Sequence, residues 1–194
     1  MEPFVKIIDN FYEHPEQIRE HAMKQKYQKF TSSNYAGNDS IDRNIINDEC
    51  KNKIQNVLGP DLKFTQARYR YAREKDHSIG FVHSDFNPDH KGKGYHVLIY
   101  LTPDELKGYD DSVGFYEHET FGIIPSDNFV KKVFKKDSFN LKKFNEYKTI
   151  KYKFNRAVIL DYNYFHAPGR THGFGEDLTN CRILQIIEVF QQHI

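Results

Sequence analysis

The sequence predicts a mainly β domain with helices packed outside it, an antiparallel sandwich or jelly roll. Two helix patterns occupy the first third of the 194-residue chain, and short strand-like segments separated by turn residues follow from about residue 64. This order of elements is typical of such folds. The length suits one domain with a sizeable core, so we expect a single domain over residues 1–194.

The N-terminal part, about residues 9–60, is expected to be largely helical. Pro15 suits a first helical turn, and an apolar stripe follows it. Gly59-Pro60 supplies a stop signal for a second helix. The expected elements are a strand at 5–8, a helix within 11–30, a loop at 31–41 and a helix at 48–58.

The β core is expected over about residues 64–190. Alternation along 64–71 places Phe64, Gln66, Arg68 and Arg70 on one side and Ala67, Tyr69 and Tyr71 on the other. Residues 95–101 form the most apolar strand pattern. The other expected elements are strands at 81–85, 156–160 and 183–190, and a hairpin of 113–116 with 121–124.

Residues 125–153 interrupt the strand pattern with nine lysines among apolar residues. The apolar spacing predicts two short amphipathic helices in an insertion or lid. A charge run usually forms a solvated face, and a basic patch that meets an anionic substrate or nucleic acid is the alternative.

Composition excludes several classes of protein. The net charge is only +1, which gives no general reason to expect nucleic acid as a partner. Cys50 and Cys181 are too few and too far apart for a disulfide framework. Since neither a signal peptide nor a membrane span is recognisable, we expect a cytoplasmic protein without a membrane partner. The oligomeric state is left open.

Two short segments predict a metal site. His83-Ser84-Asp85 is expected at a strand end, where residues two apart face the same way, and His166 is expected at the end of an apolar strand. Two imidazoles and one carboxylate on one face of an ion are typical of non-haem Fe(II) sites. Tetrahedral zinc with the same ligands is the alternative.

The remaining candidate histidines are not assigned to this site. His77, His90 and His172 lie in turn-like sequence, so we expect them to face solvent. His96 begins a strand, and His118 is expected at a hairpin tip, facing either the site or water.

Arg182 is the candidate cation for a second carboxylate. Iron oxygenases need a two-electron co-substrate, commonly 2-oxoglutarate, whose far carboxylate suits the planar fork of an arginine. Arg182 opens a strand after His166, and a return of the chain would place it on the strand beside His166. The alternative is an edge arginine paired with Glu176 or Asp177, and the rival Arg170 lies in a turn-rich run.

Taken together, these residues resemble the 2-oxoglutarate/Fe(II)-dependent dioxygenase superfamily, and in particular its prolyl-4-hydroxylase-like branch and small relatives of unassigned substrate. The similar segments are residues 7–11, 66–69, 80–85, 95–101 and 114–116. The resemblance implies a double-stranded β-helix (jelly roll, cupin-like). It covers most of residues 5–190, and the lysine-rich segment is the least typical part.

The resemblance implies a role for each site residue. His83, Asp85 and His166 would bind Fe(II), and Arg182 would bind 2-oxoglutarate, although many prolyl hydroxylases have lysine at that position. Tyr69 and Tyr100 would donate hydrogen bonds to the co-substrate or form pocket walls, with aromatic packing as the alternative.

The implied reaction uses O2 and 2-oxoglutarate to hydroxylate a substrate, such as a peptidyl proline, with release of succinate and CO2. A peptide or small molecule is the favoured substrate, and nucleic acid remains open through the lysine-rich residues 131–153. The alternatives are a non-catalytic jelly-roll binding module and a zinc-dependent hydrolase.

Overall fold

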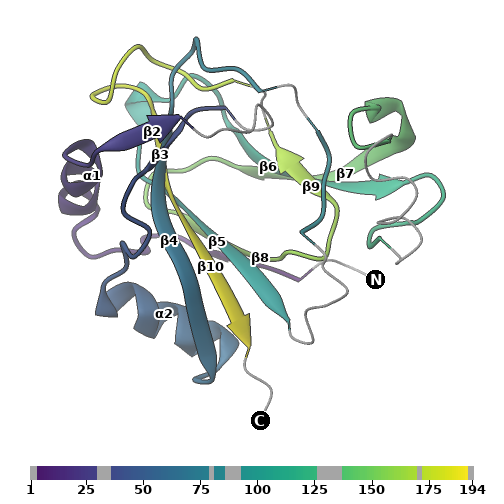
Figure 1. Ribbon diagram of the computed structural model, residues 1–194, viewed down its shortest axis with the longest axis horizontal. Helices are drawn as coiled ribbons and strands as arrows, with labels where there is room; N and C mark the ends of the chain where they lie inside the picture. The colour runs from purple at the N-terminus through teal and green to yellow at the C-terminus, as the bar shows by residue number, and fades with distance from the viewer. Residues whose placement is uncertain are drawn as a thin grey trace.

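The computed structural model describes residues 4–29, 36–78, 81–85, 93–125, 137–169 and 172–191. Two antiparallel sheets form the core of the molecule (Figure 1). The seven-stranded sheet has the order β1 (Val5–Ile8), β8 (Ala157–Asp161), β5 (Gly94–Tyr100), β10 (Arg182–Gln191), β4 (Leu62–Ala72), β3 (Asn38–Ser40) and β2 (Tyr27–Lys29). The three-stranded sheet has the order β7 (Phe144–Lys151), β6 (Asp111–His118) and β9 (His166–Pro168). The predicted mainly β architecture is confirmed.

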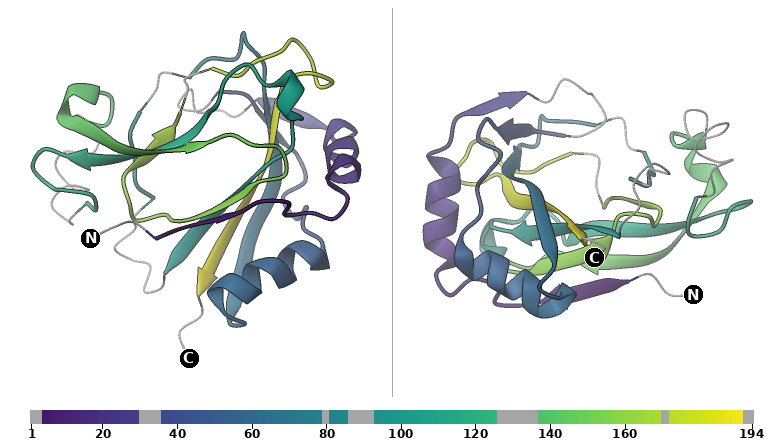
Figure 2. Two further views of the ribbon diagram at one scale, coloured as in Figure 1. Left: turned by 180° about the vertical axis from the view of Figure 1, so that it is seen from behind. Right: turned by 60° about the horizontal axis from the view of Figure 1, so that its bottom comes forward.

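Helices α1 (Pro15–Met23) and α2 (Asp48–Leu58) cover the outer face of the large sheet (Figure 2). The predicted bounds of α2 are confirmed, because local signals define both ends: the Asn47 side chain accepts a hydrogen bond from the Cys50 amide, and Gly59 adopts a φ of +100°. Two short 3₁₀ turns lie at Asp104–Leu106 and Leu141–Lys143.

The central strands are apolar on both faces because each face packs against another layer. On β5, Val97 and Ile99 belong to the core under the helices, whereas Tyr100 belongs to a second core between the sheets. Leu184 and Ile186 of β10 also belong to that second core. The interior between the sheets therefore has its own wall of apolar side chains.

Strand β4 confirms most of the predicted alternation. Ala67, Tyr69 and Tyr71 pack in the core under the helices, while Arg68 and Arg70 face the interior between the sheets. The prediction for Phe64 is wrong, because Phe64 packs with the helix-side core. A shift in the pairing of β4 with β10, between Glu188 and Val189, reverses the alternation at this point.

The N-terminal expectations need two corrections. The first helix ends at Met23, and residues 27–29 form β2 instead of a further helical turn. The expected loop at 31–41 contains β3, which pairs with both β2 and β4. Sheet pairing outweighs local preference in both places.

The expectation of two helices in the lysine-rich segment is wrong for residues 144–151. Residues 144–151 form β7, which pairs along β6. Strand β6 extends to His118 and turns back at Gly122, so residues 121–124 do not form the expected second strand. Residues 126–136 lie outside the described part of the chain.

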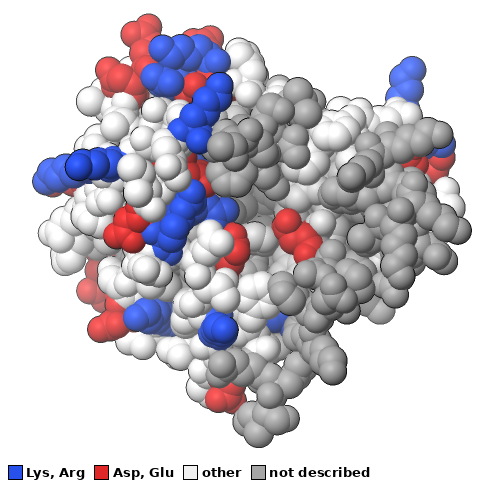
Figure 3. Space-filling view, in the orientation of Figure 1, with Lys and Arg blue, Asp and Glu red and all other residues white. Residues whose placement is uncertain are grey.

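Three further findings concern the cysteines, the helices and the surface charge. Cys50 and Cys181 are buried and unpaired. Within the described residues, neither α1 nor α2 has the length and apolar character needed to cross a membrane. Basic and acidic side chains are interspersed over the face in Figure 3, in keeping with the net charge of +1.

Candidate metal centre

Backbone hydrogen bonds bring the two predicted metal-binding segments together. The His83 amide donates to the His166 carbonyl at 2.9 Å, and the His166 amide donates to the His83 carbonyl at 2.8 Å. The Asp85 amide donates to the Tyr162 carbonyl at 3.0 Å. Segments about eighty residues apart in sequence are thereby fixed side by side.

The local structure of these segments differs from the prediction in two respects. Residues 81–85 form a single β-bridge, between His83 and His166, so they are not a regular strand. Strand β8 ends at Asp161, and His166 instead begins β9 in the small sheet. The ligand-bearing segments therefore lie opposite the large sheet.

The side chains of His83, Asp85 and His166 converge, with one potential ligand atom from each lying within 4.8 Å of the others. The Asp85 Oδ2 atom is 4.0 Å from His83 Nε2 and 3.6 Å from His166 Nε2. The His166 Nδ1–H donates to the Tyr164 carbonyl at 2.8 Å, which leaves Nε2 as the acceptor that faces the cluster. This donor set fits a divalent metal ion.

The electrostatics of the three side chains also suit a metal. Burial lowers the pKa of His83 to about 3 and also lowers the pKa of His166, so both imidazoles are neutral near pH 7. Burial alone raises the pKa of Asp85, but the hydrogen bond from His96 and the neighbouring imidazoles outweigh it and hold that pKa below its usual range. Neutral imidazoles and an ionised carboxylate are the forms that bind metals.

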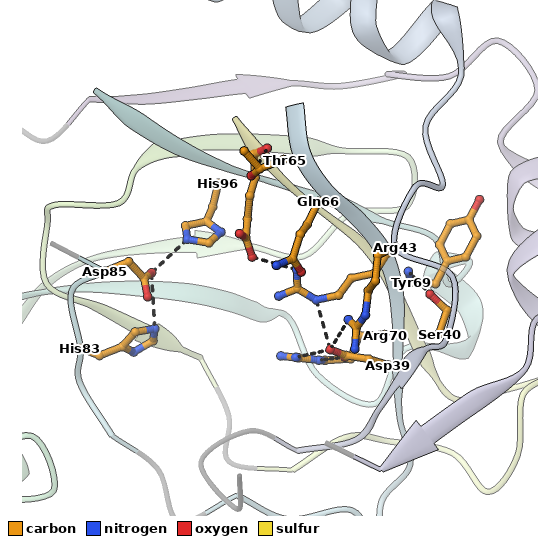
Figure 4. Close-up of polar contacts among 12 residues, drawn as sticks. Asp39, Ser40, Arg43, Thr65, Gln66, Tyr69, Arg70, His83, Asp85 and His96 are labelled. Carbon is orange, nitrogen blue, oxygen red and sulfur yellow. Dashed lines mark hydrogen bonds and ion pairs between the residues drawn. The ribbon is translucent and has the colours of Figure 1, made fainter. Parts of the chain in front are cut away.

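His96 contacts this cluster, and sequence reasoning had not assigned it to the site. Its Nε2 lies 3.0 Å from Asp85 Oδ2, and Figure 4 shows Asp85 between His96 and His83. A signal was present in the sequence, because His96, Leu98 and Tyr100 share one face of β5 by alternation. The sequence-based expectation that Tyr100 reaches the co-substrate therefore implied that His96 also lies on the strand face that borders the site.

A cavity of about 230 Å³ opens between the sheets beside these ligands. Its apolar wall comes mainly from the large sheet, and its charged lining includes Arg182. The apolar residues that line it include Leu98, Val113, Leu160, Leu184 and Ile186.

Arg182 lies in this cavity, though not where the sequence analysis placed it. It opens β10 in the middle of the large sheet, whereas His166 lies in the small sheet, so the two residues are not on adjacent strands. Its side chain is buried and, within the described residues, makes no ion pair with Glu176 or Asp177; its Nε has no hydrogen-bond partner. A buried guanidinium without a partner suits an anionic ligand.

Tyr100 and Ser112 share this end of the interior with Arg182. Burial raises the pKa of Tyr100 to about 12, and Ser112 and the positive charge of Arg182 partly oppose that rise. Apart from the contact between the Tyr100 and Ser112 hydroxyls, these two groups and Arg182 Nε are buried without a hydrogen-bond partner in the described residues. These polar atoms fit the carboxylate of a bound co-substrate. Sequence reasoning had missed Ser112, for which the sequence gives no clear signal.

Other predicted residues lie elsewhere. The expectation that Tyr69 reaches the co-substrate is wrong, because its ring packs in the helix-side core and its hydroxyl contacts His21 Nδ1 at 3.2 Å. His118 faces neither the cavity nor water; it is buried, and its Nε2 lies 3.3 Å from Asp137. His90 and Arg170 lie outside the described residues.

The sequence matches no protein-family model and no curated protein. Comparison of the fold does find similar solved structures. HygX from Streptomyces hygroscopicus, with nickel and 2-oxoglutarate bound, is 10% identical and has a TM-score of 0.65, over 99% of this chain and 84% of HygX.

Two further structures have the same architecture. The non-heme alpha-ketoglutarate-dependent epimerase SnoN from nogalamycin biosynthesis is 10% identical, with a TM-score of 0.63 over 97% of this chain and 79% of SnoN. The viral collagen prolyl hydroxylase vCPH from Paramecium bursaria Chlorella virus-1, in complex with 2-oxoglutarate, is 13% identical, with a TM-score of 0.56 over 97% of both chains. The chain therefore has the fold of these structures, a double-stranded β-helix of the jelly-roll type.

Proposed function

We propose that this protein is an Fe(II)- and 2-oxoglutarate-dependent oxygenase. The observation that carries the proposal is the convergence of His83, Asp85 and His166 at one side of a cavity that also holds Arg182, a cation without an ion-pair partner among the described residues. The fold is that of proteins crystallised with 2-oxoglutarate, among them HygX and vCPH. The ligand set and the fold therefore support the same reaction class.

Each residue has a separate task in this proposal. His83, Asp85 and His166 would hold Fe(II) on one face, and Arg182 with the Tyr100 and Ser112 hydroxyls would bind the far carboxylate of 2-oxoglutarate. When bound, iron with 2-oxoglutarate and O2 supplies the oxidising chemistry and yields succinate and CO2. Leu98, Leu160, Leu184 and Ile186 would exclude water from the reacting groups.

We infer hydroxylation of a C–H bond as the outcome. A peptidyl residue such as proline is one candidate substrate, because vCPH is a prolyl hydroxylase. SnoN is an epimerase on the same fold, so the fold leaves the outcome to be decided by the substrate and its placement.

The test is succinate release from 2-oxoglutarate in the presence of Fe(II), ascorbate and O2. We expect slow uncoupled turnover by the wild type and none by His83→Ala, while His14→Ala, which removes an exposed histidine on another element, behaves as the wild type. Binding of 2-oxoglutarate without turnover would indicate the non-catalytic binding module. Hydrolysis of a substrate by the protein in the absence of O2 would indicate the zinc-dependent hydrolase instead.

A further inference from the structure

We infer that Arg68 and Arg70 form a second anion-binding position in the cavity, which holds a carboxylate or phosphate group of the substrate. This inference rests on the proposed function and adds the substrate class to it. Both arginines line the same cavity as the metal-binding residues, and both are buried.

The register of the sheet separates Arg68 from the metal centre and from Arg182, because Arg68 pairs with Ile186, four residues along β10 from Arg182, whereas Arg70 pairs with the nearer Leu184. On the cavity face, Arg68 lies beside Ile186 of β10, and Leu98 of β5 lies on the other side of Ile186. Two strand spacings of about 4.8 Å each place β4 about 10 Å from β5, which carries His96. An anionic group of the substrate bound at Arg68 would thus be several covalent bonds away from the substrate atom that reacts at the metal.

A fully buried carboxylate holds the two guanidiniums in place. Asp39 accepts from Arg70 Nε at 2.5 Å and Arg70 Nη2 at 3.0 Å, and from Arg43 Nη1 at 3.0 Å (Figure 4). Arg68 Nε is 3.1 Å from the same carboxylate, and Arg68 Nη1 donates to Glu188 at 2.9 Å. Such fixed forks are preorganised for a further oxyanion.

The charges of this cluster, which we call the Asp39 cluster (Asp39, Arg43, Arg68, Arg70 and Glu188), do not balance. Among the described residues, three guanidiniums face two carboxylates in this cluster, which leaves one positive charge. Burial alone would raise the pKa of Asp39, but the hydrogen bond and charge of Arg70, with Arg43 and Arg68, outweigh it and hold that pKa below its usual range. The Asp39 carboxylate is therefore ionised at neutral pH.

The co-substrate does not cancel this excess. Among the described charged groups of the cavity and the Asp39 cluster, Arg182 and Asp85 offset each other, and a metal dication and a 2-oxoglutarate dianion would do the same. Because Arg68 and Arg70 are buried while the Arg43 side chain is partly exposed, the positive charge is least solvated at the buried pair, where a negative group of the substrate would bind best. Arg68 Nε also lies buried without a well-formed hydrogen bond, despite its proximity to Asp39.

The alternative is a purely structural ion-pair network that fixes β3 to β4. Proton–nitrogen NMR of the arginine Nε–H groups in the wild-type protein distinguishes an anion-binding position from a purely structural network. The full chain is loaded with Zn(II) in place of Fe(II) and saturated with 2-oxoglutarate, and is then titrated with inorganic phosphate and, separately, with acetate. Arg73, which pairs with Asp76 outside the cavity, provides the control resonance.

We expect the Arg68 Nε–H resonance to shift and saturate while that of Arg73 stays unchanged. Arg68→Gln should weaken the affinity for the anion by at least about tenfold, the loss expected for one charge-assisted hydrogen bond. The anion that saturates at the lower concentration identifies the group, phosphate or carboxylate. An Arg68 resonance that does not move, or that drifts without saturation in parallel with Arg73, overturns the inference.

The same samples test the proposed function separately. Addition of 2-oxoglutarate should shift the Arg182 Nε–H resonance only when the metal is present. Failure of that shift with a saturable Arg68 response would overturn the oxygenase proposal and retain the anion position. The opposite pair of results would overturn the anion position alone.

Discussion

His96 Nε2 lies 3.0 Å from the Asp85 Oδ2 atom, so a strand of the large sheet contacts a candidate metal ligand carried by the opposite segment. Hydrogen bonds of this kind orient a carboxylate that binds a metal. Their loss typically weakens metal affinity by about 10–100-fold, which corresponds to about 1.4–2.8 kcal/mol. His96 is therefore a positioning residue for Asp85.

Replacement of His96 tests this relationship. His96→Phe keeps a planar ring but removes the hydrogen bond, so we expect Fe(II) affinity to fall about 10–100-fold without loss of the folded state. Calorimetric titration under exclusion of O2 gives the affinity. His96→Gln, which retains a donor, should recover part of the loss. Wild-type affinity in His96→Phe would rule out the positioning role.

Arg182 is expected to dominate the affinity for 2-oxoglutarate. Arg182→Ala should weaken metal-dependent binding of 2-oxoglutarate by about 2–5 kcal/mol, because one partner of a buried charge pair is removed. Arg73→Ala, which breaks an ion pair outside the cavity, is the matched control and should leave this affinity unchanged. If Arg182→Ala binds 2-oxoglutarate as tightly as the wild type, the carboxylate is held by another cation.

The metal-free protein should lose stability as the pH falls from about 6.5 to about 3. Burial lowers the pKa of His83 from 6.5 to about 3, so the unfolded chain binds a proton in this window that the folded chain excludes. The stability that the folded protein gains from a neutral His83 is fully present above pH 6.5 and is lost progressively as the pH falls toward 3. Each unit of pKa shift corresponds to about 1.4 kcal/mol of the free energy of unfolding.

Chemical denaturation at several pH values measures this dependence. Between pH 4.5 and 6.5 the slope reports histidines more than carboxylates, whose ordinary pKa lies near 4. The slope of His83→Gln should be smaller than that of the wild type. Equal slopes would mean that His83 is already protonated in the folded protein.

Local signals made some features predictable from the sequence. The bounds of α2 follow from Asn47 and Gly59, which act within one helical turn. The segments of His83, Asp85 and His166 were recognisable because residue type and spacing carry the metal chemistry. Arg182 was recognisable for the same reason, although its sheet position was not.

Features that depend on distant pairing were not predictable. Strand β7 forms because β6 offers an unpaired edge, which outweighs the helix-like spacing of its apolar residues. Alternation separated Tyr69 from Arg68, but only the packing of the helices decides which face of β4 borders the cavity. Asp39 lies in a stretch that reads as a loop, so its burial among three arginines had no local signal.

Anaerobic titration of the metal-free protein with 2-oxoglutarate, with and without Fe(II), tests the central claim most directly. We predict one Fe(II) and one 2-oxoglutarate bound per chain, with 2-oxoglutarate binding that requires the metal. His83→Ala and His166→Ala should lose both, whereas His14→Ala should keep both. Equal binding of 2-oxoglutarate with and without Fe(II), or wild-type metal binding by His83→Ala and His166→Ala, would contradict the account.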